Sequence, residues 1–126
     1  MARILVIDDD QIVRTGIKLL LVRSGYEVVE AVDGVEGVAS YQDQGADLVL
    51  VDMFMPNKSG FEVLQELKRF DPDVKMVSIT GMGIQDGLDM EEYARRYGAL
   101  ETLQKPIDTD LLLETVAGIL QGKEKK

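Results

Sequence analysis

The sequence predicts an α/β fold in which a doubly wound, five-stranded parallel sheet carries helices on both faces. Apolar runs alternate with helical patterns along the chain, and several of these runs are continuous and β-branched, which is typical of strands covered on both faces. Five strand-helix units fit into 126 residues, the length of one domain. The expected strands cover residues 3–7, 26–31, 47–51, 74–79 and 99–103.

The helices between these strands are predicted from apolar stripes and from capping residues. A stripe at helical spacing predicts a first helix that stops at Ser24, and its members are Val13, Ile17, Leu20 and Leu21. Asp33 and Ser59 begin the second and third helices, because a glutamate follows each of them at the spacing of a capping box. A short fourth helix ends at Gly98, and a fifth follows Asp108 as its cap.

The balance of charge argues against direct binding of nucleic acid. The chain has 14 Lys and Arg against 23 Asp and Glu, for a net charge of -9, whereas affinity for a phosphate backbone comes from clustered cations. The only basic cluster along the sequence is residues 123–126. We expect these residues to form a charged, solvated tail behind a single domain of residues 1–122.

Several features that the sequence lacks limit the compartments in which the protein is expected and the reactions that it can catalyse. No apolar run approaches the roughly 20 residues of a membrane helix, and the N-terminus shows no pattern of a secretion signal, so we expect no membrane contact. The lack of cysteine fits a reducing compartment, and together these features favour the cytoplasm. The lack of histidine excludes histidine-based acid-base catalysis and a role as a phosphohistidine carrier.

Polar side chains collect at the ends of the predicted strands. Asp8 and Asp9 follow the first strand, Asp52 follows the third, Thr80 ends the fourth and Lys105 follows the fifth. The carboxyl ends of parallel strands meet at one edge of the sheet, which is where ligands bind in this class of fold. The sequence therefore predicts three carboxylates, a hydroxyl and an ammonium in one site.

Three carboxylates in one pocket suit a hard divalent cation. Mg²⁺ prefers oxygen ligands and is usually bound through one or two carboxylates and phosphate oxygens. A carboxylate beside such an ion acts as a nucleophile on phosphorus and forms an acyl phosphate. Asp52 is the candidate nucleophile because it lies on a central strand apart from the acidic pair, and Lys105 is placed to stabilise a phosphoryl oxygen.

The whole chain resembles the receiver domain of two-component response regulators. The motifs that carry the resemblance are "ILVIDDD", "LVLVDMFMPNKSG", "VSITG" and "LQKPI", in this order and at successive strand ends. The resemblance implies a flavodoxin-like fold with strand order 2-1-3-4-5. It also implies a signalling protein rather than an enzyme, one that catalyses only its own phosphorylation and dephosphorylation and regulates a downstream protein or output domain.

The resemblance further assigns roles at the metal and at the phosphoryl group. Asp8, Asp9 and Asp52 would hold Mg²⁺ together with the backbone carbonyl of Phe54. Asp52 would accept the phosphoryl group from the phosphohistidine of a histidine kinase or phosphotransfer protein.

The other members of the site would contact the phosphoryl group itself. Thr80 would bond to one of its oxygens and Lys105 would pair with it. The Lys105-Pro106 bond is expected to be cis, which an X-Pro bond permits at modest cost.

Three features depart from the family pattern, and the third, Ile107 where the family often has phenylalanine, is expected to matter little. Thr102 stands where the family usually carries an aromatic residue, which leaves the usual switch incomplete. The stretch 81–87 is rich in glycine, and we expect a mobile loop there. Bulky apolar residues, Phe54 and Met82, flank the site, and we expect them to hinder water and lengthen the phosphorylated lifetime.

Two alternative functions remain open. The first is a receiver-like module that binds proteins without phosphorylation. The absence of an aromatic residue at position 102 supports this alternative. The second is a phosphatase similar to the haloacid dehalogenases, whose Asp-x-Asp motif matches Asp8 and Asp10. That family needs a further acidic motif on a later strand, which this chain lacks, and Asp10 is better explained as the cap of the first helix.

Overall fold

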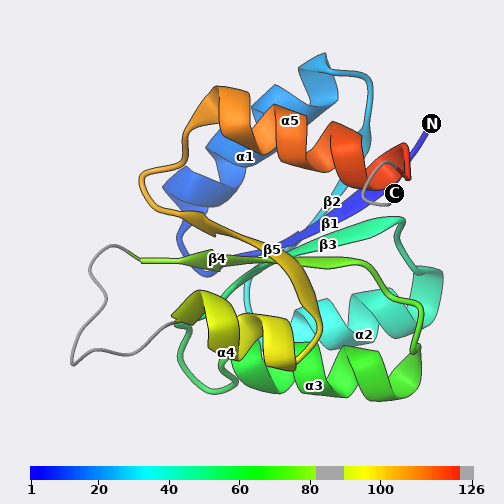
Figure 1. Ribbon diagram of the computed structural model, residues 1–126, viewed down its shortest axis with the longest axis vertical. Coiled ribbons are helices and arrows are strands. Elements are labelled where there is room, and N and C mark those ends of the chain that lie inside the picture. The colour runs from blue at the N-terminus through cyan, green and yellow to red at the C-terminus, as the bar shows by residue number, and fades with distance from the viewer. Residues whose placement is uncertain (82–89, 123–126) are drawn as a thin grey trace.

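The computed structural model describes residues 1–81 and 90–122 of the chain. Its strands form one parallel sheet in the order β2-β1-β3-β4-β5 (Figure 1), which confirms the predicted flavodoxin-like fold. In chain order the strands are β1 (Arg3–Ile7), β2 (Glu27–Ala31), β3 (Leu48–Asp52), β4 (Met76–Thr80) and β5 (Ala99–Gln104).

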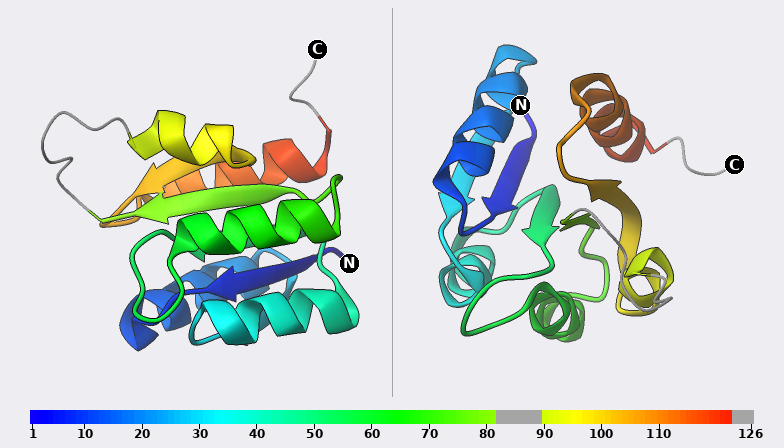
Figure 2. Two further views of the ribbon diagram at one scale, coloured as in Figure 1. Left: turned by 90° about the horizontal axis from the view of Figure 1, so that it is seen from below. Right: turned by 90° about the vertical axis from the view of Figure 1, so that its left-hand side faces the viewer.

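The helices form a layer on each face of the sheet (Figure 2). One layer consists of α1 (Gln11–Arg23) and α5 (Thr109–Leu120). The opposite layer consists of α2 (Gly34–Gln44), α3 (Gly60–Phe70) and α4 (Met90–Arg96). Each layer buries its own apolar core against the sheet, and every residue of β3 and β4 is buried. This double coverage explains the continuous apolar runs of the sequence.

The strand boundaries differ slightly from the predicted ones. β2, β3 and β4 begin later than predicted, whereas β3, β4 and β5 each continue one residue further. Asp52 pairs with Ile79, and the backbone N–H of Met53 donates to the Ile79 carbonyl at 2.8 Å, so the ladder runs past the predicted end of β3. A polar side chain at a strand end leaves these backbone hydrogen bonds intact. Asp52 and Thr80 are therefore the last residues of their strands.

The predicted helix caps are confirmed. Asp10, Asp33, Ser59 and Asp108 each accept hydrogen bonds from backbone N–H groups in the first turn of their helices. Ser59 also completes a capping box, because the Glu62 carboxylate accepts the backbone N–H of Ser59 at 2.8 Å. These caps fix where α1, α2, α3 and α5 begin, and so fix the loops that follow the carboxyl ends of the strands.

Some predictions concern segments that the structure does not describe. Met82, most of the glycine-rich stretch and residues 123–126 lie outside the described residues, so the mobile loop and the charged tail stay predictions. None of the described helices is long and apolar enough to cross a membrane.

Candidate functional site

Three carboxylates meet where β1 and β3 end side by side in the sheet. Asp8, Asp9 and Asp52 each place an oxygen within 4.8 Å of the others. Asp8 is 0% exposed and Asp52 is 3% exposed, whereas Asp9 is open to solvent. The cluster therefore has two buried members and one member at the mouth.

The two oxygens of the Asp8 carboxylate have different partners. Its Oδ1 accepts the backbone N–H of Asp10 at 2.8 Å, which ties it to the start of α1. Its Oδ2 is buried without a hydrogen bond and forms an ion pair with the Lys105 ammonium at 3.2 Å. A buried carboxylate oxygen without a hydrogen bond costs free energy unless a cation lies beside it.

Among the described residues, Lys105 is the one lysine whose ammonium group pairs with these carboxylates. Its Nζ lies 3.2 Å from Asp8 Oδ2 and 3.6 Å from Asp52 Oδ2. The backbone N–H of Lys105 donates to the Thr80 carbonyl at 2.9 Å, and the following bond to Pro106 is cis, as predicted. These backbone constraints aim the side chain across the ends of β4 and β3 toward β1.

The charged groups of this cluster shift one another's pKa values. Burial raises the pKa of Asp52 to about 7 and the neighbouring Asp8 adds to the rise, while Lys105 and the N–H of Phe54 oppose it. Burial disfavours the ammonium of Lys105, but the attraction of Asp52 and Asp8 outweighs it and raises the pKa of Lys105. One lysine therefore does not compensate both buried carboxylates.

Thr80 and Phe54 border the cluster without joining it. Thr80 is 2% exposed, and its hydroxyl donates to the Gly81 carbonyl at 3.4 Å. The backbone N–H of Phe54 donates to Asp52 Oδ1 at 3.4 Å, and Phe54 is 57% exposed. The predicted residues thus share one edge of the sheet, with the carboxylates and Lys105 in mutual contact and Thr80 turned to its own neighbour.

The donor set fits Mg²⁺. Carboxylate oxygens are the ligands that this hard cation prefers, and three of them lie close together here. Lys105 pairs with Asp8 and Asp52, so the cluster holds three carboxylates against one ammonium. The site is therefore short of positive charge.

The description "response regulator receiver domain" belongs to a family model that matches residues 4–117 of the chain. The chain belongs to this family. It is 37% identical over 122 residues to the chemotaxis protein CheY of Treponema pallidum (strain Nichols), which covers 94% of this chain and 83% of that protein. A crystal structure of a response regulator receiver domain protein from Clostridium thermocellum has a TM-score of 0.87 and 33% identity, and the match covers 98% of both chains.

A third relative shows the same kind of domain inside a longer chain. The chain is 37% identical over 115 residues to the CAI-1 autoinducer sensor kinase/phosphatase CqsS of Vibrio cholerae, over 91% of this chain and 17% of that protein. Receiver domains thus occur joined to kinase domains as well as in short proteins such as CheY.

Thr102 stands where the resemblance leads us to expect an aromatic residue, and the structure shows its partner. Thr102 lies opposite Ser78 in the β4-β5 ladder, and the two hydroxyl oxygens are 2.6 Å apart. Ser78 is 0% exposed. A hydrogen-bonded pair of small hydroxyl side chains, one buried and one partly buried, therefore links β4 to β5 two residues before Thr80.

The structure also contains a positioning residue that sequence reasoning missed. Arg14 of α1 is 8% exposed, and its guanidinium donates to the Asp8 carbonyl at 2.7 Å and to the Glu30 carboxylate at 3.0 Å. The available signal was its spacing, because Arg14 falls on the same helical face as Ile17 and Leu21. Burial raises the pKa of Glu30, but hydrogen bonds from Lys18 and Arg14 outweigh it, so the pKa is lowered overall.

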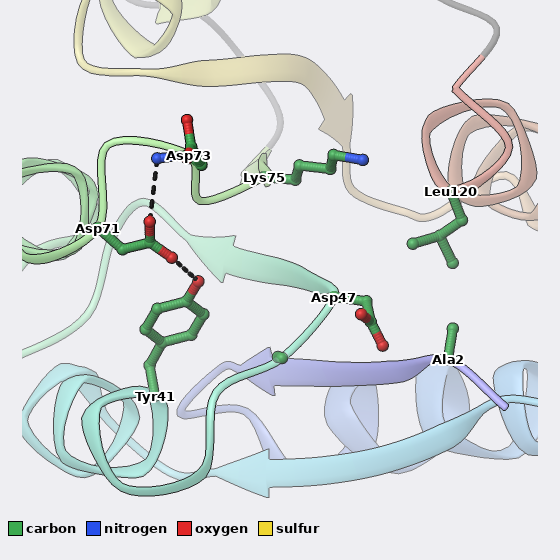
Figure 3. A pocket seen from close by; sticks show the side chains of 8 residues that line it. Ala2, Tyr41, Asp47, Asp71, Asp73, Lys75 and Leu120 are labelled. Atoms are coloured by element: carbon green, nitrogen blue, oxygen red, sulfur yellow. Dashed lines mark hydrogen bonds between the residues drawn. The ribbon is translucent and has the colours of Figure 1, made fainter.

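A hollow of about 410 Å³ lies at the opposite, amino-terminal edge of the sheet (Figure 3). Within it the Tyr41 hydroxyl donates to the Asp71 carboxylate at 2.7 Å, and the backbone N–H of Asp73 donates to the same carboxylate at 3.0 Å. The hydrogen bond from Tyr41 and the N–H of Asp73 lower the pKa of Asp71. This hollow shares no residue with the site at Asp52, so it is a separate structural feature.

Proposed function

We propose that the receiver domain takes a phosphoryl group onto Asp52 and uses it to regulate a partner protein or an output domain. The observation that carries this proposal is the packing of Lys105 against two buried carboxylates beside an exposed third one. The phosphodonor is the phosphohistidine of a histidine kinase or a histidine phosphotransfer protein. Because this chain has no histidine, it stands on the receiving side of the transfer.

The transfer forms one bond and breaks one bond. An oxygen of the Asp52 carboxylate attacks phosphorus, and the bond from phosphorus to the histidine nitrogen of the donor breaks. The nitrogen keeps the electron pair, and the product is an acyl phosphate on Asp52. Asp52 lies at the end of β3, which holds its carboxylate in place, so the protein contributes mainly positioning and charge to the transfer.

Charge on the transferred group is balanced by neighbours of Asp52. Lys105, now shared between Asp8 and Asp52, is in reach to pair with a phosphoryl oxygen. Thr80 would exchange its hydrogen bond to Gly81 for one to the phosphoryl group. That exchange moves the end of β4 and gives the phosphorylated state a different surface.

Asp8, Asp9, Asp52 and the backbone carbonyl of Phe54 would hold Mg²⁺. When bound, the ion supplies positive charge to the phosphoryl oxygens. Arg14 and the N–H of Asp10 keep Asp8 in place from the opposite side. As a signalling domain the protein would act in the cytoplasm, on no substrate other than its own carboxylate, and without binding nucleic acid directly.

One observation favours a second candidate, a receiver-like module that binds partners without phosphorylation. Thr102, where we expect the family's aromatic residue, instead pairs with Ser78, so the usual output step would lack its aromatic part. The phosphatase alternative has no such support, because Asp10 caps α1 by accepting the N–H groups of Ile12 and Val13.

The proposed function is tested by intact mass spectrometry after incubation with acetyl phosphate, with and without Mg²⁺. We expect the wild type to gain one phosphoryl mass only with Mg²⁺, and Asp52→Asn to gain none. Asp10→Asn is the matched control, because it removes a neighbouring carboxylate while asparagine still caps the helix. This control should gain the same mass as the wild type.

Failure has a defined meaning in the same experiment. A folded wild type that gains no mass from acetyl phosphate or from a phosphorylated histidine kinase would contradict the proposal. The phosphorylation-independent binding module would then be the remaining candidate. An adduct that persists in Asp52→Asn contradicts the assignment of Asp52.

A further inference from the structure

A basic pocket lies between the C-terminal ends of α3 and α4, although the domain as a whole is acidic. Lys68 and Arg69 occupy the last turn of α3, and Arg95 and Arg96 occupy the last turn of α4. All four line one pocket of about 570 Å³, and no Asp or Glu is among its described lining residues. The expectation from the sequence, that the tail is the only basic cluster, is therefore wrong, because folding joins two dipeptides that are far apart in the chain.

The helix dipoles account for only part of this cluster. Cations in the last turn of a helix interact favourably with its C-terminal carbonyl groups. Arg95 also pairs with Glu91 at 3.0 Å and Arg96 with Glu92 at 3.1 Å. These side chains are more than half exposed, so the ion pairs are weak and the arginines are easily drawn to another anion.

The two cations from α3 have no such partners. Lys68 and Arg69 are exposed, and neither forms an ion pair within 4.0 Å with a described residue. A side chain at Gly98 would meet the Lys68 stem, with Cδ 3.3 Å from the added Cβ, so this stem lies along the turn between α4 and β5. The packing holds the α3 cations beside those of α4.

The floor of the pocket is apolar and partly exposed. Leu100 is 41% exposed and Tyr97 is 37% exposed. Met76 pairs with Ala99 and Val77 with Glu101, so Leu100 is the extra residue of a bulge on the edge strand β5. Bulges turn a side chain away from the regular ladder. An exposed leucine and tyrosine ringed by arginine and lysine have the composition of a protein-binding hot spot.

We propose that this pocket binds a short acidic segment of a partner protein through an apolar anchor residue. The anchor contacts Leu100 and Tyr97, and carboxylates beside it pair with Lys68, Arg69 and the two arginines of α4. A long polyanion such as nucleic acid, or an anionic membrane, would meet the net charge of -9 of the whole chain. A short segment feels mainly charges within the Debye length of about 8 Å at physiological salt. The pocket lining carries four cations, and the glutamates that pair with its two arginines, Glu91 and Glu92, offset them only in part.

The location keeps this pocket independent of the phosphoryl site. α4 ends next to the start of β5, so the pocket is at the amino-terminal edge of the sheet, whereas Asp52 is at the carboxyl edge. Figure 1 shows α3 and α4 on the same face of the sheet. A partner bound in the pocket leaves Asp52 open to a phosphodonor, which suits a constitutive tether to a larger assembly.

The test measures binding of a fluorescent peptide in which a single leucine is flanked by glutamates. The pocket variant carries Lys68→Gln and Arg69→Gln. The matched control carries Arg23→Gln and Lys75→Gln, which remove the same charge outside the pocket. We expect the pocket variant to bind about tenfold more weakly, as for the loss of two charge contacts, and the control to bind like the wild type. Leu100→Ser should also weaken binding, because it removes the apolar floor.

Several results would overturn the proposal. They are absence of peptide binding to the wild type, equal losses in the pocket and control variants, or undiminished binding of the same peptide with glutamine at each glutamate. Tighter pocket-dependent binding of single-stranded DNA or of anionic phospholipid vesicles would assign the pocket to another class of partner. Urea unfolding of each variant confirms that the fold is intact.

Discussion

At the scale of single residues, the charges around Asp52 are positioned by backbone constraints before any phosphoryl group arrives. Arg14 holds the Asp8 carbonyl, and Lys105 is directed by its own N–H bond to Thr80 and by Pro106. Pre-arranged charge costs no reorganisation during phosphoryl transfer. Phe54, two residues after Asp52, is exposed, and we expect its side chain to affect how easily water reaches the product.

Replacing Phe54 by asparagine should shorten the life of the phosphorylated state severalfold. Phe54 is 57% exposed and its backbone N–H donates to Asp52 Oδ1, so a smaller polar side chain at this position should admit and orient water. The measurement follows loss of the phosphoryl mass over time. Phe70→Asn is the control, because Phe70 is 53% exposed at the far end of α3, and its decay should match the wild type. Equal decay of Phe54→Asn and the wild type would contradict this view.

The Tyr41-Asp71 hydrogen bond should make stability depend on acid pH. The pKa of Asp71 is lowered in the folded state, so its contribution is present above the ordinary pKa of an aspartate and is lost as the pH falls through the lowered value. Urea unfolding from pH 7 to pH 3 should show Tyr41→Phe less stable than the wild type at pH 7, with the difference shrinking toward pH 3. A difference that stays constant across this range would show that the hydrogen bond is not linked to the charge.

The residues whose location could be predicted from the sequence differ from the missed ones in what determines their location. Asp8, Asp9, Asp52, Thr80 and Lys105 were predictable, since the ends of parallel strands share one edge by topology alone. The contacts of Arg14 and the Ser78-Thr102 pair depend on how a helix packs and how two strands register, and local sequence does not fix these distances. The same limit hid the basic pocket, whose two halves come from different helices.

At the scale of elements, the start of α3 is packed directly on the end of β3. The N–H of Gly60 donates to the Met53 carbonyl at 2.9 Å, and a Cβ at Gly60 would meet the Asp52 carbonyl oxygen and would lie 2.5 Å from the Met53 Cα. The close approach is between backbones, so only glycine fits without movement of the helix. Caps and strands were predictable at this scale, but the sequence did not show which glycine makes this contact.

Gly60→Ala and Gly16→Ala should therefore change stability in opposite directions. Gly60→Ala forces α3 away from β3, and we expect a loss of about 1–3 kcal/mol in the free energy of unfolding. Gly16 lies within α1 with nothing within 4 Å of an added Cβ, so alanine there should stabilise by about 0.5–1 kcal/mol. Urea unfolding measures both values. Equal effects of the two substitutions would contradict the close approach at Gly60.

At the scale of the whole molecule, the two proposed sites lie at opposite edges of the sheet. The carboxyl edge gathers Asp8, Asp9, Asp52 and Lys105, and the amino-terminal edge carries the basic pocket and the Tyr41 hollow. Strand order and double coverage were predictable from alternating patterns, because five parallel strands with right-handed crossovers allow few arrangements. The surface of the amino-terminal edge was not predictable from the sequence, since it depends on side chains from several separate elements.

Mg²⁺ should stabilise the folded domain as a whole. A ligand that binds only the folded state adds about 2.7 kcal/mol at a concentration one hundred times its dissociation constant. Thermal unfolding with Mg²⁺ and with a chelator should show this rise for the wild type and for Asp10→Asn. Asp9→Asn should respond far less, because it removes an exposed member of the carboxylate cluster. A rise of equal size in Asp9→Asn would place the metal elsewhere.

The most direct test of the account locates the phosphoryl group itself. Borohydride reduces an acyl phosphate to an alcohol and releases phosphate, so a phosphorylated aspartate becomes homoserine. Peptide sequencing by mass spectrometry after phosphorylation, reduction and digestion should find homoserine at position 52, and only when Mg²⁺ was present. Homoserine at position 8, 9 or 10 instead, or at no position in a protein that carries the phosphoryl mass, would contradict the assignment of Asp52 as the phosphoacceptor.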